Sequence, residues 1–205
     1  KLKNIKVVRD VGRTHTTNYI KVIGENTNYK LTIDNIYSVA QTKVRSNNNF
    51  RGRNLGGISY MPQGGTELRV NLVGDNRMGC LHIDNTETDK IIIEGTGSLT
   101  TADADFDTVK DIDNASGLDI GDTENGYVSN HWAAVIGGNT LNANTENVFN
   151  IYINSGIIFA GAARGEDCTA IGGGGNGSGQ VFITGGVVTA VARTAGTAIG
   201  GGMGH

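Results

Sequence analysis

Aspartates are the side chains of this sequence that are best suited to chemistry. From Asp103 onwards they alternate with other residues, and alternate positions of an extended segment lie on one side of the chain. Carboxylates gathered in this way suit a hard cation such as Ca²⁺. The candidate ligands are Asp103, Asp105, Asp107 and Asp111. The segment departs from an EF-hand loop, because Thr108 and Asn114 stand where that loop requires glycine and glutamate. We favour a solvated acidic loop and keep a Ca²⁺ site as the alternative.

Tyr152 and Phe182 form a second candidate site, because they occupy equivalent positions in two similar segments. Segments 151–160 and 181–190 align with each other without gaps. Ile151 and Ile153 face one side of an extended chain, and Tyr152 faces the other. We therefore predict that the two rings stack on the exterior. Ordinary cross-strand packing is slightly favoured over a flat aromatic platform for a sugar ring or another subunit.

Other reactive residue types show no motif. The histidines are scattered and are interpreted as surface or packing residues: His15, His82, His131 and His205. Cys80 and Cys168 are interpreted as two buried thiols, with a long-range disulfide as the alternative. The glycine run 172–179 lacks the Lys-Ser/Thr pair of a phosphate loop.

The elements that carry these residues repeat along the chain. An Ile-Gly-Gly motif follows an alanine three times, once with a valine between them, and its isoleucines are Ile136, Ile171 and Ile199. Short Ile/Val-rich segments alternate with Gly/Asn breaks, which is typical of strands joined by tight corners. A strand–corner pattern with a period of about 30 residues predicts a parallel β-solenoid. The three isoleucines should then form one interior ladder, with Ala134, Ala170 and Ala198 beside it.

Weaker copies of the strand motif lie upstream. The positions taken as equivalent are unevenly spaced, and they are Ile33, Leu72, Ile93, Ile153 and Ile183. The long sequence interval between Ile93 and Ile153 indicates either two coils or one coil with a long insertion. We expect about seven rungs, with an irregular acidic insertion near 103–130. Residues 1–30 are expected to form an N-terminal strand or cap region, and 31–205 a β-helix that continues or stacks beyond 205.

The repeat resembles a known kind of protein. Ala-Ile-Gly-Gly-Gly alternating with Ile-x-Ile-x-Gly-Gly-x-Val-x-Ala is similar to the glycine-rich repeat regions of large bacterial cell-surface proteins, common in gut Firmicutes. The match is good over about 130–205 and loose over 30–100, with Ser155 in place of one glycine. The resemblance implies a right-handed parallel β-helix, an extracellular location at the bacterial cell surface, and an adhesive or structural role. It brings no catalytic motif with it.

Composition excludes several other classes. Among 205 residues there are 32 glycines without a Gly-X-Y period and one proline, which excludes collagen. A net charge of −3 provides no general basic surface, so we expect no nucleic-acid partner. A hydrophobic share of 38% excludes a disordered tail. No apolar stretch reaches the length of about 18 residues that a membrane helix needs, so we expect no membrane insertion in this segment.

The sequence therefore favours a structural or adhesive segment of an extracellular surface or fibre protein. We expect a stiff rod that presents loops and can assemble end to end, with glycans or other copies of itself as partners. The alternative is a carbohydrate-active module, which binds glycans on the aromatic face or cleaves them as a lyase or glycosidase at the acidic loop. We favour a role without catalysis, because no carboxylate recurs at the offset of the repeat. Apart from Ca²⁺, no cofactor is expected.

Overall fold

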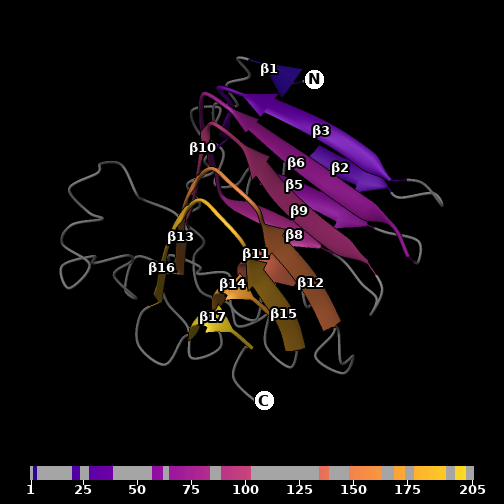
Figure 1. Cartoon of the computed structure of the whole chain (residues 1–205), viewed down its shortest axis with the longest axis vertical. Coiled ribbons are helices and arrows are strands. Elements are labelled where there is room, and N and C mark those ends of the chain that lie inside the picture. Colours follow the sequence, from indigo (N-terminus) through magenta and orange to yellow (C-terminus); the bar gives the residue numbers. More distant parts are fainter. Residues whose placement is uncertain are drawn as a thin grey trace, which may run out of the picture.

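The computed structural model describes residues 2–3, 20–23, 28–38, 57–61, 65–83, 89–102, 134–138, 148–162, 169–173, 178–192 and 197–201. Within these ranges every regular element is a β-strand, and the strands form three parallel sheets (Figure 1). This confirms an all-β chain with stacked parallel strands, the arrangement of a β-solenoid. No helix in these ranges is long and apolar enough to cross a membrane.

The three sheets are named A, B and C here. Sheet A has six described strands, in the order β1 (Leu2–Lys3), β3 (Tyr29–Asp34), β6 (Glu67–Val73), β9 (Lys90–Gly95), β12 (Val148–Ile153) and β15 (Ser178–Ile183). Sheet B has five, in the order β4 (Tyr37–Ser38), β7 (Asp75–Met78), β10 (Ser98–Ala102), β13 (Ile157–Ala162) and β16 (Val187–Ala192). Sheet C has six, in the order β2 (Ile20–Ile23), β5 (Gly57–Met61), β8 (Cys80–Ile83), β11 (Ala134–Gly138), β14 (Thr169–Gly172) and β17 (Thr197–Gly200). From β3 to β17 the chain visits the sheets in the order A, B, C, so each coil adds one strand to each sheet.

The register confirms the repeat that the sequence predicts. The pairing of β12 with β15 keeps one constant offset along both strands, and β13 pairs with β16 at the same offset. Ile136 pairs with Ile171, and Ile171 with Ile199, as the predicted ladder requires. Ile93 pairs directly with Ile153. The long step between these two isoleucines is therefore one coil with a long insertion and not two coils.

Two expected equivalences are wrong. Ile93 pairs with Val70, two residues before Leu72. A slip of two residues leaves the same side chains facing the core, so alternation alone does not define the register here. Ala134 pairs with Thr169, so it is not the equivalent of Ala170. Ala134 lies two residues before the ladder isoleucine, whereas Ala170 lies one residue before it.

The core is a stack of inward-facing aliphatic side chains from all three sheets. Alternate residues of β6 and β9 are fully buried, and those of the central strands of sheet C join them. Burial of one such isoleucine stabilises the fold by about 1.5–3 kcal/mol. The core members of sheet A are Ile33, Leu68, Val70, Leu72, Ile91, Ile93, Ile151 and Ile153. These strands hold the alternate residues on the outer face of sheet A in fixed positions.

The glycine-rich runs begin with glycines that the fold requires, directly after the ladder isoleucines Ile136 and Ile171. A Cβ atom on Gly137 would lie 2.0 Å from the carbonyl oxygen of Gly172, and one on Gly172 would lie 1.8 Å from that of Gly200. Both residues have positive φ, +132° and +143°. Only glycine allows the backbones to approach this closely in that conformation. The runs therefore do not behave as flexible linkers at these positions.

Candidate functional site

The outer face of sheet A carries the aromatic pair that the sequence singled out. Tyr152 lies between the buried Ile151 and Ile153, so its ring points away from the core. Phe182 occupies the paired position on β15. The rings stack with centroids 4.6 Å apart and planes 11° apart, which confirms the predicted exterior stack. Ring stacking beyond area burial contributes about 0.5–1.5 kcal/mol.

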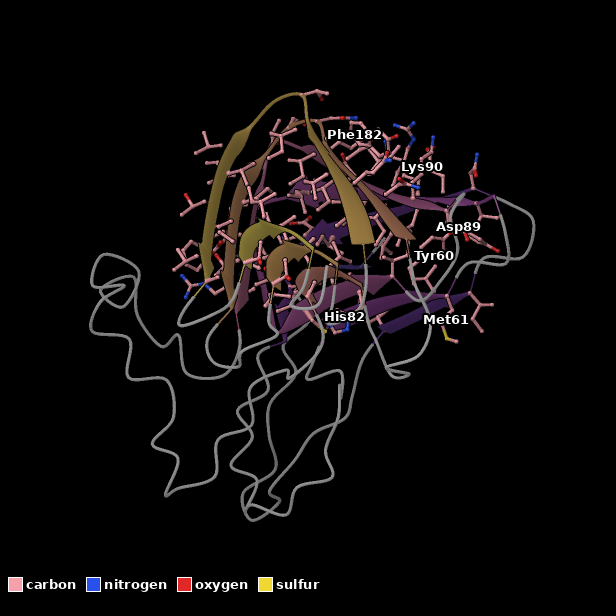
Figure 2. All side chains as sticks on the ribbon, turned by 90° about the horizontal axis from the view of Figure 1, so that it is seen from below. Tyr60, Met61, His82, Asp89, Lys90 and Phe182 are labelled. Atoms are coloured by element: carbon pink, nitrogen blue, oxygen red, sulfur yellow. The ribbon has the colours of Figure 1, made fainter. Side chains whose placement is uncertain are left out.

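A lysine approaches this stack from the neighbouring strand. Nζ of Lys90, on β9, lies 5.8 Å from the centroid of the Tyr152 ring, within the range of a cation–π interaction. Because sheet A has the order β9, β12, β15, Tyr152 lies between Lys90 and Phe182. Figure 2 shows Lys90 and Phe182 on the same side of the molecule. Tyr152 therefore has neighbours on both sides, while Phe182 is 39% exposed and has no described strand beyond it.

One row of outer residues crosses sheet A in register and changes character along the way. It runs through Lys30, Arg69, Ile92, Tyr152 and Phe182. The residues on β3 and β6 are cationic, and those on β12 and β15 are aromatic. The outer face of sheet A thus has a charged half and an aromatic half.

The charged half is a chain of alternating ion pairs. Glu94 accepts hydrogen bonds from Lys30 Nζ and Arg69 Nη1, each at 3.2 Å. Glu67 pairs with Arg69, and with Lys90 Nζ at 2.9 Å. Three cations and two carboxylates therefore compensate one another, and each exposed pair contributes no more than about 1 kcal/mol. This half is not a strongly basic patch.

The electrostatics of Glu67 oppose a role as a general acid. Burial acts to raise the pKa of Glu67, but the hydrogen bonds and charges of Lys90 and Arg69 outweigh it. The pKa of Glu67 is therefore lower than its ordinary value. A carboxylic acid that donates a proton near neutral pH needs a raised pKa. Glu67 is therefore suited to ion pairing and not to acid catalysis.

A buried polar cluster, missed by sequence reasoning, lies where β5, β6 and β9 meet. Tyr60 donates or accepts a hydrogen bond at Thr66 Oγ1, and Asp89 Oδ1 accepts bonds from the Thr66 N–H at 2.7 Å and its hydroxyl at 3.3 Å. All three residues are buried, and burial is the largest cause of the raised pKa of Tyr60. Figure 2 shows Tyr60 and Asp89 close to Lys90. The signal in the sequence is that Thr66 and Asp89 each directly precede a strand, and these strands pair.

His82 is a buried packing residue, which is one of the two roles that the sequence predicts for the histidines. Its Nε2–H donates a hydrogen bond of 2.7 Å to the carbonyl oxygen of Ala134. Burial lowers the pKa of His82 to about 4, and the hydrogen bond to Ala134 acts in the opposite direction. The imidazole is therefore neutral at pH 7. Cys80, in the same strand, is also buried, whereas Cys168 lies outside the described residues.

The candidate Ca²⁺ ligands lie outside the described residues: Asp103, Asp105, Asp107 and Asp111. The Ca²⁺ site and the solvated loop both remain predictions. Within the described ranges, no group of three or more His, Cys, Asp or Glu residues is arranged to hold a metal ion.

No family model, curated protein or solved structure matches this chain. The functional interpretation therefore rests on the arrangement of the three sheets and their outer face, together with the sequence resemblance.

Proposed function

We propose that the chain is a structural or adhesive segment of an extracellular bacterial surface or fibre protein. In this proposal the chain forms a stiff β-solenoid rod that presents loops. The observation that carries this proposal is the three-sheet stack, in which parallel strands stay in register around one apolar core. Each strand bonds to the equivalent strand of the next coil, so the stack resists bending across its whole section.

The spacing between strands supports the presentation of loops. The chain leaves sheet B at Ala102 and enters sheet C at Ala134, yet both residues stay in register with their neighbours. In the coil that follows, the equivalent residues Gly161 and Thr169 are only eight positions apart. A regular stack that accepts such unequal connections can carry long segments at its corners.

The finer features of the fold belong to the same proposal. We propose a right-handed coil, because parallel strands joined by a crossover are right-handed in about 98% of cases. About seven rungs are proposed, against six described strands in sheets A and C. The location outside the cell follows from the resemblance to glycine-rich surface repeats.

Surface labelling tests the proposed function. Antibodies raised against the 205-residue chain should label intact cells of the bacterium that makes it. Protease treatment of intact cells should remove the label. An antibody against a cytoplasmic enzyme serves as the control for cell integrity. Labelling that requires permeabilised cells would overturn the proposal.

Glycan binding is the second candidate, and the exterior stack of Tyr152 and Phe182 favours it. Sugar rings pack their C–H faces on aromatic rings, and Phe182 has the more exposed ring of the pair. On a glycan array, Phe182→Ala and Tyr152→Ala should remove the signal. Ile157→Ala is the control, since Ile157 is 57% exposed on sheet B. Equal signals for the three variants would contradict glycan binding at this face.

Glycan cleavage is tested separately at the acidic segment. A lyase or glycosidase would release unsaturated or reducing sugar ends from polysaccharides, and Asp105→Ala should remove that activity. Absence of released ends with the wild-type chain would contradict the enzyme interpretation.

A further inference from the structure

The outer face of β12 and β15 carries a set of six neighbouring side chains in three rows. The register places each residue of β12 beside its equivalent on β15, and directly after the two strands Thr184 Oγ1 donates a hydrogen bond of 2.9 Å to Asn154 Oδ1. The set consists of Asn150, Tyr152, Asn154, Gln180, Phe182 and Thr184. Because side chains alternate along a strand, this face points away from the core whatever lies beyond β15.

This set, called the neutral face here, combines aromatic rings with uncharged polar groups. The row of Tyr152 and Phe182 lies between a row of two amides and a row of one amide and one hydroxyl. None of these side chains is charged at neutral pH. Outward positions two residues apart on a strand lie about 7 Å from each other. A ring-shaped ligand on the aromatic row therefore has polar side chains on both sides.

Several hydrogen-bonding groups of the neutral face have no partner among the described residues. They are the side-chain amide of Gln180, the hydroxyl of Tyr152 and the amide nitrogen of Asn154. An amide group donates and accepts hydrogen bonds, as a sugar hydroxyl does. In small-molecule sites, aromatic side chains provide contact area and a few polar groups such as Asn and Gln fix the orientation of the ligand. The neutral face offers both.

The cations beside the neutral face are already paired with carboxylates. Nζ of Lys90 lies 5.8 Å from the centroid of the Tyr152 ring and 2.9 Å from Oε2 of Glu67, whose side chain is 10% exposed. Arg69 pairs with Glu67 and with Glu94. A carboxylate or sulfate ligand would have to displace Glu67 from these pairs, so it gains little from the cations.

We infer that the neutral face binds an uncharged glycan. The C–H face of a sugar packs on the aromatic row, and its hydroxyls bond to the amides of Gln180 and Asn154. An uncharged sugar needs no ionic partner when it loses water on binding, whereas a charged one does. The inference names the ligand class of the glycan-binding candidate and rests on that candidate.

A glycan array that holds uncharged, carboxylated and sulfated glycans tests the inference on the 205-residue chain. The strongest signals should come from uncharged glycans and should be the same at low and high NaCl, because salt screens only interactions between charges. Strongest signals from carboxylated or sulfated glycans, falling with salt, would overturn the inference and leave the glycan-binding candidate standing. An array without any signal would overturn both.

Alanine variants test the residues of the neutral face by isothermal titration with the strongest array glycan. Gln180→Ala and Asn154→Ala should each weaken binding about two- to tenfold, the value of one net hydrogen bond. Asn71→Ala is the matched control, because it removes an amide from the outer face of β6, in the charged half. Weakening by Asn71→Ala equal to that by Gln180→Ala would contradict the inference.

Arg69→Gln separates an uncharged ligand from an anionic one. It removes a cation of the charged half and should leave binding of the glycan unchanged. Weaker binding by this variant, with the fold intact by circular dichroism, would show that the ligand is held through its charge and would overturn the inference.

Discussion

At the scale of single residues, Gly172 and Gly200 show two reasons why a position requires glycine, namely backbone strain and a steric clash. Both have φ near +140°, which strains any other residue. Among the described residues, a carbonyl oxygen lies 1.8 Å from the position of a Cβ atom on Gly172, and none lies so close to one on Gly200. The two positions therefore form a natural comparison of backbone strain alone with strain plus a steric clash.

We predict that Gly172→Ala lowers the free energy of unfolding more than Gly200→Ala does. Backbone strain contributes about 1–3 kcal/mol at both positions, and overpacking adds about 1–3 kcal/mol at Gly172. Urea unfolding of the two variants and the wild type measures both values. Equal losses of unfolding free energy would show that β17 moves away from the added methyl group at position 172 without a free-energy cost.

His82 gives a pH dependence with a defined sign. Its pKa falls from 6.5 in the unfolded chain to about 4 in the fold, because burial opposes the charged imidazolium. The unfolded state therefore binds the proton more tightly than the folded state. The stability is complete above pH 6.5 and is lost as the pH falls towards 4, by about 3 kcal/mol.

Urea unfolding at a series of pH values between 7 and 4 checks this prediction. His82→Gln should flatten the curve, because glutamine does not titrate and keeps an N–H donor for Ala134. The lowered pKa of Glu67 acts with the same sign, but only below 4.5, the ordinary pKa of a glutamate. If the free energy of unfolding depends on pH equally in the wild type and in His82→Gln, His82 is not the group responsible.

At the scale of elements, the cluster of Tyr60, Thr66 and Asp89 joins β5 to the starts of β6 and β9. We predict that Asp89→Ala is more destabilising than Tyr60→Phe. The first leaves the buried Thr66 N–H without its acceptor, which costs about 1–3 kcal/mol beyond the lost bond. The second removes one hydroxyl and keeps the ring in the core, at about 0.5–1.5 kcal/mol. Chemical denaturation compares the two, and the reverse order would contradict the cluster as described.

The strands also show how much the sequence predicts. The pairing of segment 151–160 with 181–190 follows from identical spacing, and the Tyr152–Phe182 stack follows from it. The register of Val70 with Ile93 does not follow, because apolar residues alternate throughout β6 and two registers bury the same face. The sequence does not predict β7, because Asp75–Met78 is a short, mostly polar strand. Its buried Asn76 side chain binds the N–H of Ile36 at 3.0 Å, a contact between residues that are far apart in the sequence.

The candidate site was predictable in one half and not in the other. The aromatic half lies within the constant offset of β12 and β15. The ion pairs join Glu94 to Lys30 and to Arg69, at two very different sequence separations that no single period relates. Such contacts depend on the lengths of the intervening connections, and a repeat of the strands alone does not specify them.

At the scale of the whole molecule, the stack should tolerate removal of its longest insertion. We predict that replacing residues 103–133 with the segment 192–196 preserves the β-sheet signal in circular dichroism. In the last coil that segment joins Val191 to Thr197, the register equivalents of Ala102 and Ala134. Loss of the signal would show that the insertion is part of the core.

The shortened chain also separates the two interpretations of the acidic segment. A Ca²⁺ site at Asp103, Asp105, Asp107 and Asp111 predicts a heat of Ca²⁺ binding that is lost in the shortened chain. A solvated loop predicts no heat in either chain. Isothermal titration of both chains decides between them.

The constant offset between β12 and β15, and between β13 and β16, has a consequence for how such a chain changes over generations. A tandem duplication of one coil in the gene inserts a unit whose upper and lower surfaces already match their new neighbours. Deletion of the coil formed by β12, β13 and β14 would leave β15 and β16 able to take the same registers on β9 and β10. The length of the stack can therefore change in single genetic events, without any new contact having to be selected.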